Sequence, residues 1–140
     1  MLAAPTGTPT AGTLYLVDGA AIRILDAHGR PIRTITDDHS PTDLAVAHAG
    51  TPLAGTVYVG HAAGAAVTAI THDTFTVSSI RAGTRPSQLA VAPAGTPTAG
   101  TLYTANFVDN TVSVIPPGHT TGDTIPVADH PSTIQIVPTT

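Results

Sequence analysis

The feature that most constrains the fold of this chain is a segment that occurs three times in its 140 residues. The segment reads Gly-Thr-Pro-x-Ala-Gly, and its copies, 43 and 45 residues apart, are Gly7–Gly12, Gly50–Gly55 and Gly95–Gly100. A second anchor, a proline with an aliphatic residue three positions later, recurs every 45 residues at Pro41/Leu44, Pro86/Leu89 and Pro131/Ile134. Two independent anchors in one phase indicate a true internal repeat, which has to be recognised before any other fold assignment.

Each repeat contains four short segments that alternate like β-strands and are separated by turn residues. The best-preserved set of four is predicted at Gln88–Ala92, Thr101–Ala105, Thr111–Ile115 and Thr124–Val127. The first repeat predicts strands at Leu14–Asp18, Ala21–Leu25 and Ile32–Thr36. The Gly-Thr-Pro insert predicts a turn between the first two strands, because Gly accepts positive φ and Pro fixes its own φ. Four strands in about 40–50 residues, repeated, are typical of β-propeller blades.

Composition supports the same all-β fold class. The chain contains no Lys and no Glu, so its charges come from five Arg and nine Asp. Helices usually draw on Glu and Lys, whereas β-branched residues favour strands. Hydrophobic residues make up 41% of the chain but aromatic residues only 4%, so aliphatic side chains have to fill the core. We expect one three-blade module over residues 1–140, with repeats at about 7–49, 50–94 and 95–140.

The third repeat carries a resemblance to a known family. Tyr103–Asn106 reads Tyr-Thr-Ala-Asn, and Asp109–Ile115 reads Asp-Asn-Thr-Val-Ser-Val-Ile. This pattern resembles the YVTN β-propeller repeat, a relative of NHL-type blades, and Pro131–Ile134 fits it as well. The other repeats depart from it, because His61 and Asp18 replace the Asn. In that family the motif builds the blade and is not catalytic, so the resemblance implies a fold, and it favours an extracellular location.

The phase of the repeat predicts an oligomer. The first complete strand is a second strand, and Pro131–Pro138 is predicted to be a first strand with nothing after it. Three blades do not close a ring, because propellers need about four to eight. An open array would expose apolar faces and unpaired strand edges. We therefore expect ring closure by oligomerisation, six-bladed as a homodimer, with a trimer of nine blades as the alternative.

The expected closure is an exchange of strands between chains. The C-terminal strand of one chain would complete the first blade of its partner through Ser132, Ile134, Ile136 and Val137. Met1–Thr6 also aligns with the end of a first strand, Leu89–Ala94. It therefore either competes with the C-terminal strand or forms a frayed tail. A different alternative is that the chain is a fragment or an engineered part of a larger propeller.

Candidate ligand-binding residues lie in the loops that lead into the first strands, on the channel face of a propeller. They are His39, Arg85, Asp129 and His130. Gathered around the ring axis, they could hold an anion, or a metal through neutral imidazoles; the alternative is that they are solvated loop residues. In the neighbouring loops, Asn106 and Asp109 are expected to cap their turn. Since no histidine pair has zinc-ligand spacing, we expect no metal site within one chain and no cofactor.

The residue types present argue against catalysis. Without Cys there is no thiol nucleophile, disulfide or Cys-ligated metal. Without Glu the chain lacks the residue on which the metal-binding or acid–base chemistry of related propeller hydrolases, lactonases and lytic enzymes depends. Ser40, His39 and Asp43 could be combined into a triad, but the sequence shows no nucleophile turn. We expect no enzymatic activity.

Charge and hydropathy limit the partners. A net charge of −4 and a pI near 5.9 argue against nucleic acid. No apolar run is long enough to span a membrane, and the N-terminus lacks the features of a signal peptide. The expected function is a scaffold or interaction module that forms a ring with itself and presents its channel face to another protein. The alternative is a propeller that binds a small anion or sugar, although the absence of Trp disfavours sugar.

Overall fold

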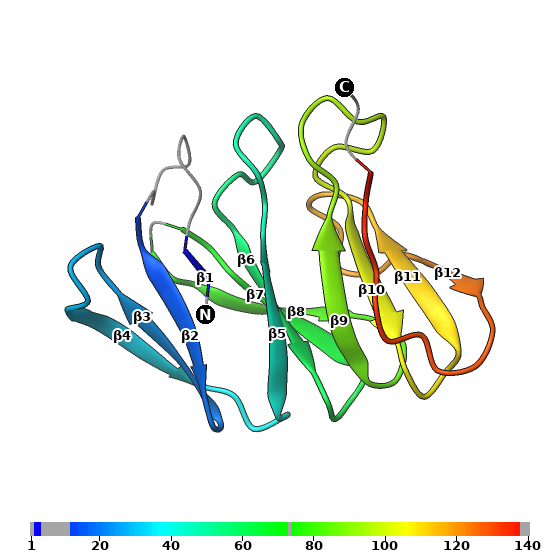
Figure 1. Ribbon diagram of the computed structural model, residues 1–140, viewed down its shortest axis with the longest axis horizontal. Coiled ribbons are helices and arrows are strands. Elements are labelled where there is room, and N and C mark those ends of the chain that lie inside the picture. Colours follow the sequence, from blue (N-terminus) through cyan, green and yellow to red (C-terminus); the bar gives the residue numbers. More distant parts are fainter. Residues whose placement is uncertain (1, 4–11, 73, 138–140) are drawn as a thin grey trace.

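Three antiparallel sheets of four strands each make up the computed structural model (Figure 1), which describes residues 2–3, 12–72 and 74–137. Blade 1 consists of β1 (Leu2–Ala3), β2 (Leu14–Asp18), β3 (Ala21–Leu25) and β4 (Pro31–Thr36). Blade 2 consists of β5 (Pro41–Val46), β6 (Val57–His61), β7 (Ala66–Ile70) and β8 (Val77–Arg81). Blade 3 consists of β9 (Pro86–Val91), β10 (Leu102–Asn106), β11 (Thr111–Ile115) and β12 (Asp123–Pro126).

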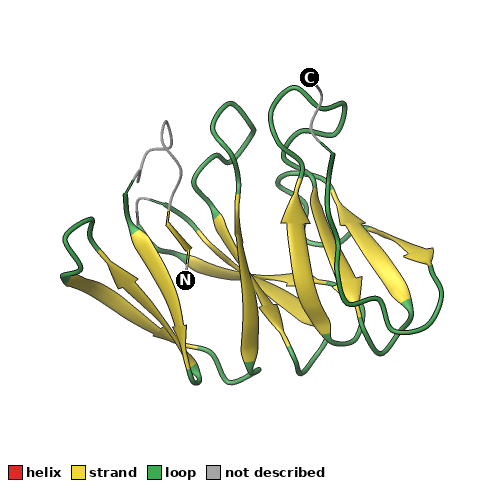
Figure 2. Cartoon of the chain, viewed as in Figure 1, coloured by secondary structure: helices red, strands yellow, loops and turns green. Residues whose placement is uncertain are grey.

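The strands of each sheet are neighbours in chain order, so every blade is an up-and-down meander. The blades fan out from a common centre at which β1, β5 and β9 lie (Figure 1). Figure 2 shows strands, turns and loops and no helix within the described residues. The same residues accordingly contain no helix that is long and apolar enough to cross a membrane.

The predicted strands agree closely with the observed ones. β2, β3 and β11 have the predicted bounds, and β4, β9, β10 and β12 differ from the predicted ones by one or two residues at their ends. β9, for example, begins at Pro86 instead of Gln88. A proline at the first position of a strand is tolerated because no ladder hydrogen bond is required from its nitrogen.

The loops before β5, β9 and residue 131 share one unusual backbone conformation. Ser40, Arg85 and His130, spaced by 45 residues, have φ of 58°, 58° and 49°. Residues with a Cβ seldom adopt this left-handed conformation, so surrounding contacts have to hold it. Around Arg85, its N–H donates to the carbonyl of Gly64 at 2.8 Å, and its own carbonyl accepts from Phe107 N–H at 3.0 Å. The backbone at His130 therefore has the conformation that precedes the inner strand in blades 2 and 3.

The Gly-Thr-Pro inserts form the predicted turns in the second and third repeats. The Thr51 hydroxyl donates to the carbonyl of His48 at 2.6 Å, and the Thr96 hydroxyl donates to the carbonyl of Pro93 at 2.7 Å. The first copy, Gly7–Gly12, lies outside the described residues except for its last glycine.

Inserts of neighbouring blades touch one another. A Cβ added to Gly50 would lie 3.2 Å from the Cβ of Ala94, and one added to Gly100 would lie 3.1 Å from Pro52. The inserts of blades 2 and 3 therefore pack with almost no space between them.

The apolar core lies between the blades. The junction of blades 1 and 2 buries Tyr15, Ile22, Ile24, Val46, Val57, Val59 and Ile70. The junction of blades 2 and 3 buries Ala47, Tyr58, Val67, Ala69, Ile80, Leu89, Val91, Leu102 and Ile115. Blade 2 therefore buries both of its faces, and blades 1 and 3 each bury one.

The inner strand of blade 1 differs from the expected one. Leu2 pairs with Tyr15 and Ala3 pairs with Leu14, so the chain itself supplies part of this strand. The expectation that another chain has to supply the whole strand is wrong at these two positions. The repeat alignment explains why, since Leu2 and Ala3 occupy the places of Ala90 and Val91, where β9 pairs with β10. A frayed tail is thereby ruled out for residues 2–3, while the other residues of 1–6 lie outside the described part.

The predicted strand Pro131–Pro138 is not a strand in residues 131–137, and Pro138 lies outside the described residues. These residues run beside blade 3 (Figure 1). Ile134 and Ile136 line a groove together with Ala90 and Val91. A strand requires a neighbour with free backbone groups. In this repeat an inner strand pairs with the second strand that follows it, as β9 pairs with β10, and no second strand follows residue 131 among the described residues.

We expect Val67→Ala to lower the free energy of unfolding by about 2 kcal/mol, because the Val67 side chain is fully buried between blades 2 and 3. Val77→Ala removes the same atoms from a neighbouring strand where the side chain is 49% exposed, and it should cost less than about 1 kcal/mol. Urea unfolding at one protein concentration measures both values. Equal losses would contradict the assignment of the core to the blade junction.

Candidate functional sites at the blade junctions

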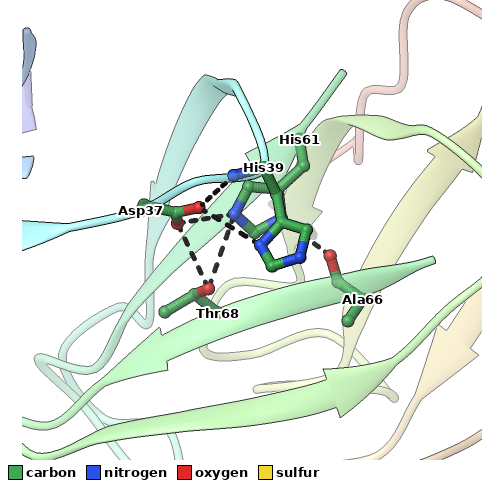
Figure 3. A network of polar contacts seen from close by, with 5 residues as sticks. All are labelled: Asp37, His39, His61, Ala66 and Thr68. Carbon is green, nitrogen blue, oxygen red and sulfur yellow. Dashed lines mark hydrogen bonds and ion pairs between the residues drawn. The ribbon is translucent and has the colours of Figure 1, made fainter. Parts of the chain in front are cut away.

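A buried polar network joins blade 1 to blade 2 (Figure 3). Asp37 follows β4, whereas His61 ends β6 and Thr68 lies in β7. The His61 Nε2 lies 2.6 Å from the Asp37 Oδ2, and the Thr68 hydroxyl donates to the same oxygen at 3.3 Å. On the opposite side of the imidazole ring, His61 Nδ1 donates to the carbonyl of Ala66 at 2.7 Å. This network links two segments that belong to different blades.

The network is a buried ion pair. Asp37 is 6% exposed and His61 is 2% exposed. The carbonyl of Ala66 can only accept, so Nδ1 of His61 carries a hydrogen. Nε2 faces the carboxylate of Asp37, so both ring nitrogens lie against oxygen atoms that accept hydrogen bonds.

The surroundings favour the charged form of Asp37. Burial alone would raise the pKa of this carboxyl group, but the hydrogen bond and charge of His61 oppose that effect. The backbone N–H of His39 and the hydroxyl of Thr68 donate to the same carboxylate. Together these partners hold the pKa of Asp37 below its ordinary value.

Blade 3 has a neutral version of this network. Asn106 occupies the place of His61, and its amide donates to the hydroxyls of Thr111 at 3.0 Å and Ser113 at 2.9 Å. Gly83, from the segment after β8, lies against it, and the Gly83 N–H donates to Ser113 at 3.3 Å. Asn106 is fully buried and its amide donates to side-chain hydroxyls of β11, in contrast to the expectation that it caps its turn. Asp109 likewise accepts from the N–H of Thr84, in the loop that leads out of blade 2, at 2.7 Å.

A third version of this network lies at the end of β2 in blade 1. Asp18 and Arg23 occupy the places of His61 and Thr68, and they form an ion pair at 3.2 Å. Their side chains are 57% and 47% exposed, respectively. The two other networks are covered by the segment that leaves the preceding blade, and the described residues place no such segment over this one.

The four predicted ligand-binding residues do not form one cluster. His39 lies with His61, their ring centroids 5.7 Å apart, at the junction of blades 1 and 2. Arg85 and His130 meet at Phe107 instead: the Arg85 guanidinium lies 4.7 Å from the ring centre, and His130 stacks on the ring at 4.6 Å. Asp129 is exposed, and no contact brings its side chain to the other three within the described residues.

Ser40, His39 and Asp43, which the sequence argued against as a triad, do not form one in the structure. Asp43 accepts from the N–H of Leu89 at 3.0 Å, which ties β5 to β9, and burial raises the pKa of its carboxyl group. The nearest acidic partner of the His39 ring is Asp37, at 3.7 Å. Among the described residues no group of three or more acidic or histidine side chains could hold a metal ion.

An open groove of about 610 Å³ runs beside the inner strands of blades 2 and 3. Its walls come mainly from the same two positions of successive repeats, Ala45, Ala90 and Gln135 and, one residue later, Val46, Val91 and Ile136. The groove is therefore made by two inner strands and by the segment that takes the place of a third.

Two solved structures resemble this chain. Hydrazine synthase from Kuenenia stuttgartiensis matches 88% of the chain with a TM-score of 0.71 and 22% identity. Dihydro-heme d1 dehydrogenase NirN, in complex with DHE, matches 92% of the chain with a TM-score of 0.70 and 18% identity. The chain has a β-propeller fold.

The likeness concerns the fold alone. The chain spans 35% of the hydrazine synthase chain and 27% of the NirN chain. No family model matches the chain, and no curated protein is significantly similar to it in sequence. The resemblance to YVTN repeats therefore stays a prediction.

We expect Asp37→Ala to lower the free energy of unfolding at pH 7 by about 3 kcal/mol, because it leaves His61 buried and unpaired. Since the pKa of Asp37 is lowered by folding, its contribution is complete above the ordinary value of 3.8 and is lost as the pH falls through the lower, folded-state pKa. The free energy of unfolding, measured between about pH 7 and pH 2, should therefore decrease less steeply below pH 4 for Asp37→Ala than for the wild type. Asp38→Ala, at an exposed neighbour, should keep the wild-type profile, and a shared profile for all three proteins would refute the buried pair.

Proposed function

We propose that this chain is a non-enzymatic scaffold module that supplies three blades to a closed β-propeller ring and completes the ring with a second copy of itself. The observation that carries the proposal is the exposure of the two end faces of the array. The repeat allows each of these faces to be compared, residue by residue, with a face that is buried inside the array.

The outer face of blade 3 lacks its neighbour. On blade 2 the face toward blade 3 is buried through Tyr58, Val67, Ala69 and Ile80. The residues 45 positions later are Tyr103, Val112, Val114 and Ile125. The first three are only half-buried, and exposure rises from 7% at Ile80 to 51% at Ile125. This face has the composition of a blade junction without a second blade.

The outer face of blade 1 is its counterpart. At the internal junction the equivalent residues, Val57, Val59 and Ile70, are fully buried against blade 1. In blade 1 those positions are Leu14, Leu16 and Leu25, and all three are only half-buried. Blade 3 of one copy and blade 1 of another therefore offer each other the two faces that meet inside the chain. Because the faces differ, two copies close a ring through two identical contacts.

At such a contact, both copies would contribute to the inner strand of blade 1. The repeat register would pair Ile136 with Leu14 and Ile134 with Leu16 of a second copy. Leu2 and Ala3 already occupy part of this position, so the C-terminal segment would extend the inner strand beside Leu16 or displace β1. Strand exchange is thus part of the proposal in this modified form.

The absence of catalysis is also proposed, and the burial of the most reactive pair supports it. His61 and Asp37 are buried within a junction and hydrogen-bonded to protein atoms, so no substrate can reach the imidazole without opening the blades. The left-handed φ of Ser40 is shared with Arg85 and His130 and therefore belongs to the repeat, unlike a nucleophile turn. Both structural neighbours bear enzyme names, but one fold supports many functions.

Light scattering after size exclusion tests the ring. We expect about 28 kDa, twice the 14.0 kDa of the chain, whereas a monomer would exclude closure by a second copy and about 42 kDa would indicate a trimer. Ile125→Asp should shift the mass to the monomer, because it places a charge on the outer face of blade 3. Val77→Asp, at a similarly exposed position outside both end faces, is the control and should remain dimeric. Removal of residues 131–140 should also give a monomer; an unchanged dimer would refute the role of the C-terminal segment.

A second candidate function is the binding of a small anion. Arg85 and His130 meet at one exposed edge of blade 3 through Phe107, and neither side chain has an ion pair within the described residues. His130 Nδ1 lies 3.0 Å from the carbonyl of Phe107, which leaves Nε2 for a ligand. Two nitrogen donors beside one aromatic ring suit a phosphate or carboxylate group.

Titration with inorganic phosphate, followed by the NMR signals of His130, tests this candidate. Arg85→Gln should weaken binding by at least about tenfold, since it removes a charged donor. Arg81→Gln, which alters an exposed arginine of β8, should leave the affinity unchanged. Binding that is indifferent to Arg85, or no saturation, would end the candidate.

A further inference from the structure

The polar position at the end of the second strand follows one rule in blades 2 and 3. In blade 2, His61 and Thr68 are covered by Asp37, and in blade 3, Asn106 and Ser113 are covered by Gly83. The covering residue in both cases comes from the segment that leaves the preceding blade. This rule depends on geometry and not on one chemistry, because one network is ionic and the other is neutral.

Blade 1 has the network but lacks the cover. Asp18 and Arg23 stand at the same two positions, and Thr68, the equivalent of Arg23, faces the preceding blade at 3.3 Å from Asp37. Arg23 therefore faces the side on which a preceding blade would lie. Among the described residues, its exposed guanidinium forms an ion pair only with Asp18.

The segment that leaves blade 3 carries the matching charge. The repeat places Val127 where Asp37 stands and Asp129 where His39 stands. At the internal junction His39 reaches the network, with its ring 5.7 Å from the ring of His61. Asp129 is exposed and has no ion pair within the described residues, so its carboxylate is available.

We propose that Arg23 of one copy binds Asp129 of a second copy at each closing junction of the ring. This inference rests on the proposed function and adds to it the contact that selects the partner. Arg23 then lies between two carboxylates, Asp18 of its own chain and Asp129 of the other. The uncovered Asp18–Arg23 pair of blade 1 and the carboxylate of Asp129 after blade 3 then lie in one interface. Their opposite charges favour association of blade 1 with blade 3 over association of two like ends.

A charge exchange tests the proposal. Arg23→Asp and Asp129→Arg, each alone, should raise the dimer dissociation constant by at least about tenfold, because each brings like charges together at both junctions. The double variant Arg23→Asp, Asp129→Arg should recover most of the wild-type affinity. Arg30→Asp, in the exposed turn before β4, makes the same charge change elsewhere and should neither weaken the dimer nor rescue Asp129→Arg. Analytical ultracentrifugation measures all dissociation constants.

The outcomes separate this inference from the ring itself. A wild-type chain that stays monomeric overturns the proposed function and this pair together. A wild-type dimer that both single variants leave intact, or that the double variant fails to restore, overturns the Arg23–Asp129 pair and leaves the ring standing. Circular dichroism melts establish that each variant is folded, and the neutral changes Arg23→Gln and Asp129→Asn, which should weaken the dimer less, serve if a reversed charge prevents folding.

Discussion

The packing of one blade face against the next is the interaction on which the rest of this structure depends. A four-stranded meander has two apolar faces, and each is removed from water only by another blade. Blade 2 achieves this on both sides, so its inner residues Val57, Val59 and Val67 are fully buried. The burial of the polar networks, the course of the entering loops and the contacts of the inserts all presuppose that this packing is in place.

Much of the fold follows from the sequence because the repeat states it several times. Strand positions, insert turns and blade boundaries recur at spacings of 43 to 45 residues, so an error in one copy is corrected by the others. Residues 131–137 are the exception: they have the sequence of an inner strand, but no second strand of a following blade lies beside them among the described residues. Local pattern specifies the ability to form a strand, whereas pairing depends on what lies alongside.

The candidate sites were less predictable for the opposite reason. Asp37 and His61 lie 24 positions apart in different blades, and the equivalents of this pair are Ala82 and Asn106, so comparison of the repeats hides the ion pair. Phe107 was missed similarly, because Ala62 stands at its place in blade 2. His39, Arg85, Asp129 and His130 were recognised as loop residues of one face, but their separation among different junctions depends on the fan of the blades. The sequence signal that could have revealed these sites was that aligned positions carry different polar residues in different repeats.

The tight contact between inserts bears on the size of the assembled ring. With Gly50 against Ala94 and Gly100 against Pro52, the tips of blades 2 and 3 can move no closer together, although the sheets behind them could still pivot. Such contacts act as spacers that set the angle between adjacent blades, and this angle determines how many blades complete a full turn. Changes in the bulk of the inserts therefore offer a way to select among rings of different size without altering the sheets.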